Sequence, residues 1–352
     1  MFDVPTAKCE WVRRWRRNGK RGVNLLGWEM EIRKDVHRTQ VTRMEDFQLR
    51  LMDLKERIER LKRKKRALIL AHNYQRPEVQ EIADVVGDSL ELAIAAQNID
   101  ADIIVFCGVD FMAETAYVLN PDRKVLLPDI GAICPMAQML NAEMIREARR
   151  AHPDAEVVLY VNTSAHAKAL ADCICTSANA PEIVNAMSSQ NIIFGPDKNL
   201  SYFVRKRSDK RIITVPEYGM CPTHHQISLE DLMAARASHP YAEVVVHPEC
   251  VPEVQENADF IASTSGMLRY CSKSSASEFV IGTEIGLIYR LKKQNPSKKF
   301  YPISENAVCP QMKMHSLPKI EAALEREKPV VSVPEDVAAD ARMAIERMIS
   351  HR

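Results

Sequence analysis

Short apolar runs alternate with amphipathic stretches along most of the chain. Buried strands typically span about four to eight residues, and three such runs follow one another: Ala67–Ala71, Ile103–Phe106 and Lys124–Leu127. Between them, Pro77–Val86 and Met112–Leu119 repeat their apolar positions at helical spacing, the first with a proline in its opening turn. Strands that alternate with helices in this way favour a parallel sheet covered by helices.

The same order of elements returns twice further along the chain. The strands expected in the later copies are Glu156–Tyr160, Asn191–Gly195 and Arg211–Val215, then Glu243–His247, Glu278–Gly282 and Lys299–Ile303. An amphipathic helix over Glu45–Lys65 precedes the first copy, and two helical stretches follow Pro318. We therefore expect an α/β protein of three pseudo-symmetric α/β/α sandwich domains, whose short parallel sheets surround a central site.

Domain boundaries follow from the three copies. The predicted α/β domains are residues 46–135, with the C-terminal helices of residues 316–352 packed on the first domain, then 136–222 and 223–315.

The first 45 residues differ in composition from the three copies. Trp11–Arg21 mixes aromatic and basic side chains, as targeting peptides and nucleic-acid contacts do. We favour a basic extension at residues 1–45 that is disordered or not native, with Met30 or Met44 as the true start.

Single residues repeat in the same register as the strands. Each copy begins at the end of its first strand (His72, Tyr160 or His247) and then carries an Ala-Asp pair, a hydroxyl side chain, a glycine and a Cys-Pro pair. These positions are Asp84, Asp172 and Asp259; Ser89, Ser177 and Thr264; Gly108, Gly195 and Gly282; and Cys134, Cys221 and Cys309. The cysteines are 87 and 88 residues apart, too far for solenoid repeats of about 20–50 residues.

The three repeated cysteines are candidate metal ligands. Cys134, Cys221 and Cys309 all follow strand ends, where parallel α/β proteins bind ligands. Buried structural cysteines are the alternative, but recurrence in three copies favours ligation. Zinc fingers use closely spaced pairs, which these cysteines lack, whereas iron–sulfur clusters accept thiolates from separate domains. Three ligands on a 4Fe-4S cluster would leave one iron open, as a Lewis acid for loss of water.

The remaining six of the nine cysteines lack this periodicity. Cys173 and Cys175 could chelate as a pair at the end of a helix, although a structural role is favoured. We expect structural or incidental roles for Cys9, Cys107, Cys250 and Cys271.

Polar side chains at the same strand ends suit a substrate with several carboxylates. The candidates are His72, Tyr74, Ser89, Tyr160, Asn162, Ser177, His247 and Thr264. Helix capping is the alternative for the three hydroxyl positions. Glu249 is a candidate general base, with a surface salt bridge as its alternative. One of His224 and His225 could face the substrate. Tyr74, Glu249 and these two histidines have no evident counterparts in the other copies, which suggests that they carry the proton chemistry.

Bulk composition favours a small-molecule partner. The 352 residues carry a formal net charge of +1, which gives no reason to expect nucleic acid or an anionic membrane as a partner. No apolar run approaches the roughly 20 residues of a membrane span, and the start lacks a secretory signal. An odd number of widely spaced cysteines indicates reduced thiols, and we expect a cytoplasmic protein.

Together, the motifs resemble those of the quinolinate synthase family over about residues 50–345. The matching segments are Ala71–Gln75, Gly87–Ser89, Gly108–Met112, Cys134–Ala137, Tyr160–Asn162, Cys175–Asn179, Cys221–Pro222, His247–Glu249, Ser263–Thr264, Gly282–Gly286 and Cys309–Pro310. The resemblance implies three α/β/α domains around a 4Fe-4S cluster. It also implies condensation of iminoaspartate with dihydroxyacetone phosphate to give quinolinate, phosphate and two waters, in the de novo synthesis of NAD.

Carried over by position, the resemblance assigns roles to individual residues. Cys134, Cys221 and Cys309 look like the cluster ligands, with the open iron on the substrate. Tyr74 and Glu249 resemble the acid–base residues, and His224 the histidine on the phosphate side. The substrate binders would be His72, Ser89, Tyr160, Asn162, Ser177, His247 and Thr264. Transient contact with an aspartate-oxidising enzyme would supply the unstable imine.

Two other functions use the same features. A different open-iron hydro-lyase would act on another di- or tricarboxylic acid and would form no pyridine dicarboxylate. An iron–sulfur sensor would need a nucleic-acid-binding element, and the near-neutral charge and the repeat motifs offer none.

Overall fold

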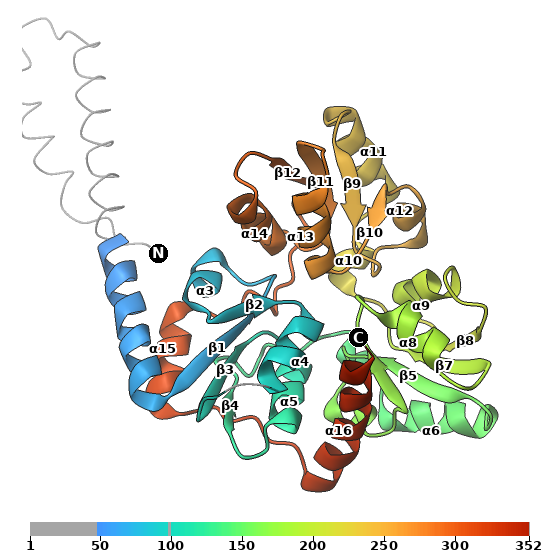
Figure 1. Cartoon of the computed structure of the whole chain (residues 1–352), viewed down its shortest axis with the longest axis horizontal. Coiled ribbons are helices and arrows are strands. Elements are labelled where there is room, and N and C mark those ends of the chain that lie inside the picture. The colour runs from blue at the N-terminus through green and yellow to red at the C-terminus, as the bar shows by residue number, and fades with distance from the viewer. Residues whose placement is uncertain (1–47, 98–99, 352) are drawn as a thin grey trace, which may run out of the picture. The chain divides into compact units, whose positions relative to one another are not determined.

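Three parallel four-stranded sheets form the framework of the protein (Figure 1). The computed structural model describes residues 48–97 and 100–351. The chain divides into two compact units, Met1–Leu54 and Lys55–Arg352, and all three sheets belong to the second. The predicted extension at residues 1–45, together with Cys9, lies outside the described residues.

All three sheets have the same strand order. The first is β2-β1-β3-β4, with β1 (Ala67–His72), β2 (Val85–Gly87), β3 (Ile103–Cys107) and β4 (Lys124–Leu126). The second is β6-β5-β7-β8, with β5 (Glu156–Tyr160), β6 (Cys173–Cys175), β7 (Asn191–Gly195) and β8 (Arg211–Thr214). The third is β10-β9-β11-β12, with β9 (Glu243–Val246), β10 (Phe260–Ile261), β11 (Glu278–Gly282) and β12 (Lys299–Pro302). The expected α/β class and the threefold repetition are confirmed.

Helices connect these strands and cover the sheets. A helix over residues 48–65 leads into β1. The first copy adds α3 (Pro77–Ile82), α4 (Ser89–Gln97) and α5 (Asp110–Leu119). The second has the short 3-10 turn η1 (Ala137–Met139), α6 (Ala142–Ala151), α7 (Ala165–Lys168), α8 (Ala180–Ala186) and α9 (Lys198–Arg205). The third has α10 (Pro222–His225), α11 (Leu229–Ser238), α12 (Pro252–Glu256), α13 (Thr264–Lys273) and α14 (Gly286–Gln294).

The chain ends in α15 (Leu317–Arg326) and α16 (Glu335–Ser350). Helix α15 packs near β3 of the first sheet. Helix α16 contacts β6 and α7 of the second copy as well as α5 of the first. The exact domain boundaries stay a prediction. No helix in residues 48–97 and 100–351 is both long and apolar enough to cross a membrane.

Each copy contains a strand that the sequence analysis missed. The predicted helix Pro77–Val86 ends at Ile82, and the chain then enters β2 beside β1. Strands β6 and β10 occupy the equivalent places in the other sheets. Strands of two or three residues at a sheet edge are too short to show a period of two, so the apolar pattern could not reveal them.

The repeated Ala-Asp pairs fix these edge strands. Each aspartate accepts a hydrogen bond from a backbone N–H at the start of the first strand, at 2.7 Å in every copy: Ile69 to Asp84, Val157 to Asp172 and Val244 to Asp259. Each also pairs with a basic side chain from a preceding helix, namely Lys62, Arg149 and Arg236. The repeat of aspartates is therefore structural, because it ties the edge of each sheet to its first strand.

We expect Asp172→Ala to lower the free energy of unfolding by about 1–3 kcal/mol, because the Val157 N–H loses its charged acceptor. Arg149→Met leaves this acceptor in place and removes the half-exposed ion pair, together with the hydrogen bond from Arg149 to the Leu170 carbonyl, and should cost about 0–1 kcal/mol. Urea unfolding of both variants measures the difference. Equal losses would show that the ion pair, and not the hydrogen bond, stabilises this edge.

Candidate active site

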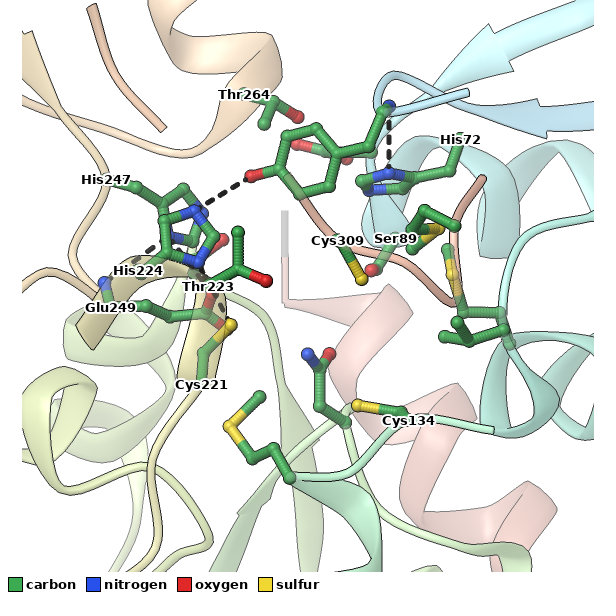
Figure 2. Close-up of a pocket in the computed structure, with 18 of the residues that line it drawn as sticks. His72, Ser89, Cys134, Cys221, Thr223, His224, His247, Glu249, Thr264 and Cys309 are labelled. Atoms are coloured by element: carbon green, nitrogen blue, oxygen red, sulfur yellow. Dashed lines mark hydrogen bonds and ion pairs between the residues drawn. The ribbon is translucent and has the colours of Figure 1, made fainter. Parts of the chain in front are cut away.

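One cavity lies at the carboxyl ends of strands from all three sheets (Figure 2). About 670 Å³ of space lies between its lining atoms, part of it open to solvent. Every candidate site residue from the sequence lines it: His72, Tyr74, Ser89, Cys134, Tyr160, Asn162, Ser177, Cys221, His224, His247, Glu249, Thr264 and Cys309. The structure thus brings together residues separated by up to 237 positions in the chain.

The three repeated cysteines differ from the other cysteines in their surroundings. Of the eight in the described residues, Cys134, Cys221 and Cys309 are partly exposed, whereas the other five are buried. Figure 2 shows the three sulfur atoms directed toward the same space. Burial raises the pKa of each thiol, and the neighbouring thiols add to the effect at Cys134 and Cys221. Three soft donors of this kind need a cation to hold them as thiolates, so they fit an iron–sulfur cluster.

The other cysteines have structural surroundings. Cys173 and Cys175 lie on strand β6 and not at a helix end, and both are buried. Cys107 ends β3, and Cys250 and Cys271 are completely buried.

Two buried histidines present the same tautomer to the cavity. The N–H of Tyr74 donates to Nδ1 of His72 at 3.2 Å, and the N–H of Glu249 donates to Nδ1 of His247 at 3.3 Å. Because Nδ1 accepts in both rings, the proton is on Nε2. Burial lowers both pKa values to about 3, so both imidazoles are neutral donors at neutral pH.

Tyr74, Asn162 and Glu249 occupy one structural position in the three copies. Each stands two residues after the head of its copy, and all three line the cavity. The expectation that Tyr74 and Glu249 have no counterparts was therefore wrong. Their side chains differ in chemistry, and identity-based comparison of the copies could not reveal the shared position.

Glu249 is a buried carboxylate of the cavity and is only 3% exposed, which excludes a surface salt bridge. Burial by itself would raise its pKa, but the adjacent His224, which also hydrogen-bonds the carboxylate, holds the pKa below its usual range. Nδ1 of His224 lies 2.7 Å from one carboxylate oxygen, Oε2. The other oxygen, Oε1, has no hydrogen-bond partner in the described part of the chain, and neither has Oδ1 of Asn162. Two buried acceptors without donors in one cavity are a strong indication of a ligand site.

A hydrogen-bonded cluster on the other side of His224 includes a residue that the sequence analysis missed. Nε2 of His224 lies 3.2 Å from the Tyr74 hydroxyl and 2.8 Å from the hydroxyl of Thr283, the missed residue. These two hydroxyls are 2.6 Å apart. Burial raises the pKa of Tyr74 well above its usual value, so the phenol keeps its proton. Thr283 directly follows the repeated glycine Gly282, and this position next to a repeated residue is the feature of the sequence that could have identified it.

The structure separates the two adjacent histidines. His224 is 1% exposed and lines the cavity, and its Nδ1 also lies 3.1 Å from Sγ of Cys221. His225 is partly exposed, contacts the Asn199 side chain at 3.3 Å and lies outside the cavity. Cys221, His224 and Glu249 have ligand atoms within 4.8 Å of one another, so a single metal ion is a second possible occupant of this side.

In the first and third copies, the residue before the repeated hydroxyl caps the helix that follows. Asp88 accepts from the N–H groups of Leu90 and Glu91, and Ser263 accepts from that of Gly266. In the second copy, the Thr176 hydroxyl accepts from the N–H of Ala178 in a turn before α8, whose N-cap Asn179 makes no side-chain capping hydrogen bond. The hydroxyls of Ser89, Ser177 and Thr264 are therefore not the caps. Thr264 instead accepts from the Asn73 amide at 2.7 Å, which joins the first copy to the third.

Comparison with known proteins agrees with this arrangement. Residues 56–350 match the family model described as quinolinate synthetase A protein. The quinolinate synthase of Methanothermobacter thermautotrophicus is 54% identical over 300 residues, which cover 85% of this chain and 98% of that protein. The quinolinate synthase of Pyrococcus horikoshii is 54% identical over 298 residues, 85% of this chain and 99% of its own length.

A more distant relative agrees as well. The quinolinate synthase of Methanocaldococcus jannaschii is 50% identical over 303 residues, 85% of this chain and 99% of its own length. The matches span all three sheets and the whole cavity, so the chain belongs to the quinolinate synthetase A family.

Proposed function

We propose that this protein condenses iminoaspartate with dihydroxyacetone phosphate to give quinolinate, phosphate and two waters in the de novo synthesis of NAD. The observation that carries the proposal is one cavity that combines three inward-facing thiols with the unpaired carboxylate oxygen of Glu249. Membership of the quinolinate synthetase A family supports the same reaction.

Cys134, Cys221 and Cys309 would hold a 4Fe-4S cluster. Bound there, the cluster would supply an open iron that acts as a Lewis acid toward a substrate oxygen. The other side chains of the cavity would bind and orient the substrates and move protons.

The substrate carboxylates would bind to neutral donors. His72 and His247 offer Nε2–H groups, and Ser89, Ser177, Thr264, Tyr160 and Asn162 offer hydroxyl and amide groups. Burial raises the pKa of the Tyr160 phenol well above its usual value, so it also remains a donor. Fixing both substrates by several such bonds would lower the entropic barrier to ring closure.

Proton transfer would use the connected set of Glu249, His224 and Tyr74. Glu249 is ionised, with Oε1 free to accept a substrate proton, while His224 holds Oε2 in place. Tyr74 keeps its proton and would act as the acid, with its hydroxyl oriented by Thr283. His224, at the junction of these groups, would lie on the phosphate side.

The reaction is tested by an anaerobic assay for quinolinate with cluster-reconstituted protein and both substrates. Formation of a pyridine dicarboxylate, seen by its ultraviolet absorbance, separates this reaction from that of a hydro-lyase on another acid. Absence of the product with an intact cluster would contradict the proposal. A cytoplasmic location and transient contact with an aspartate-oxidising enzyme stay predictions from the sequence.

Glu249→Gln tests the base. The variant keeps the side-chain shape but cannot accept a proton at neutral pH, and we expect turnover to fall by about 10²–10⁴-fold. Iron and sulfide contents should remain at the wild-type level, because Glu249 is not among the three proposed cluster ligands. Full turnover with both substrates would show that another group is the base.

Cysteine variants test the ligand set. Cys134→Ala, which leaves Cys221, His224 and Glu249 intact, should lose iron and acid-labile sulfide together after anaerobic reconstitution. The matched control Cys271→Ala changes a completely buried cysteine and should retain both. If Cys134→Ala kept one metal ion and no sulfide was found in wild type, a single-ion site would replace the cluster.

His72 and His247 should make stability depend on pH. Their pKa values fall from 6.5 to about 3 on folding, because burial disfavours the charged ring. The unfolded chain therefore binds protons that the folded protein does not, so this contribution is present above pH 6.5 and lost as pH falls toward 3. Urea titrations at several pH values in this window should show a shallower dependence for the double variant His72→Gln, His247→Gln. An unchanged slope would contradict the assignment.

A further inference from the structure

A second set of carboxylates repeats with the cysteines. Asp110, Asp197 and Glu284 each stand two residues after a repeated glycine, where the second long strand of their copy gives way to the next helix; Asp110 is the first residue of α5. Asp197 and Glu284 are completely buried, and Asp110 is partly buried. The repeated cysteines Cys134, Cys221 and Cys309 follow these three carboxyl residues by 24, 24 and 25 positions, respectively.

Each of these carboxylates accepts a hydrogen bond from the backbone N–H of a repeated cysteine. The distances are 2.9 Å from Cys134 to Asp110, 2.9 Å from Cys221 to Asp197 and 3.2 Å from Cys309 to Glu284. The same interaction in three copies, made by two aspartates and one glutamate, indicates that the bond itself is the repeated feature.

The second oxygen of each carboxylate is held as well. Asp110 accepts from the Gln138 amide at 3.3 Å, Asp197 from the N–H of Leu200 at 2.7 Å, and Glu284 from the N–H of Gly286 at 2.7 Å. Two hydrogen bonds to one carboxyl group hold the side chain beside the cysteine.

Each cysteine is therefore restrained on both sides. Its N–H is bound to a carboxylate, and the proline that follows restricts its own backbone to extended conformations. Cys221 shows this geometry, with φ −80° and ψ 114°. With the backbone fixed, the direction of the Cα–Cβ bond is fixed, and only the side-chain rotamer remains free.

We propose that Asp110, Asp197 and Glu284 are positioning residues that hold the three thiols in the geometry required to bind the cluster. The inference rests on the proposed cluster but concerns residues that do not touch it. It also explains why every repeated cysteine precedes a proline.

Asp110 offers the cleanest test. Asp110→Ala removes the acceptor, whereas Asp110→Asn keeps an oxygen that can accept from Cys134. Loss of partners that orient metal ligands typically costs about 10–100-fold in metal affinity, so anaerobic release of iron to a chelator should be faster by about 10–100-fold in the alanine variant. The asparagine variant should release iron at nearly the wild-type rate.

Asp84→Ala is the matched control, because Asp84 accepts a backbone N–H in the same copy but away from the cysteines. Both alanine variants should unfold more readily, but only Asp110→Ala should release iron faster and alter the electron paramagnetic resonance spectrum of the reduced cluster. Equal iron release by Asp110→Ala and wild type would overturn the inference. An asparagine variant as defective as the alanine variant would also overturn it, since charge and not the hydrogen bond would then matter.

The results that would overturn the proposed function differ from those that would overturn this inference. Wild-type protein that retains a cluster but makes no quinolinate would overturn the reaction and leave the positioning role intact. Wild-type protein that takes up no iron and sulfide would overturn the proposed cofactor and this inference with it.

Discussion

Parallel pairing of the strands is the constraint on which the site depends. In a parallel sheet, every strand ends at the same edge, so residues that follow different strands become neighbours. Three sheets of the same strand order supply three such edges. Their end residues line one cavity, which therefore collects chemical groups from the whole length of the chain.

Repeated carboxylates keep these edges in register. Asp84 and its equivalents tie each edge strand to the first strand, and Asp110 and its equivalents bind the N–H groups of the cysteines. Both sets use carboxyl oxygens as acceptors for buried backbone donors, which would otherwise be costly to desolvate. These hydrogen bonds involve backbone donors and not the ligand, so the same bonds can repeat in all three copies.

The chemistry of the cavity is asymmetric within that symmetric frame. The position two residues after the head of each copy holds Tyr74, Asn162 or Glu249, and the position three residues after each cysteine holds Ala137, His224 or Met312. Three equivalent thiols suit a symmetric cofactor. A substrate that must lose protons from particular atoms needs unequal neighbours. Burial keeps His72 and the Tyr74 phenol neutral, whereas His224 keeps Glu249 ionised against the effect of burial.

The sequence by itself determined the α/β class, the three copies and the residues of the cavity, because long apolar strands and an 87-residue register are visible in one dimension. It could not reveal the edge strands of two or three residues, since they are too short to show a period. Nor could it reveal Thr283, the separation of His224 from His225, or the bonds from the cysteine N–H groups. Those features depend on distances between segments that only tertiary packing brings together, and so does the burial that sets each protonation state.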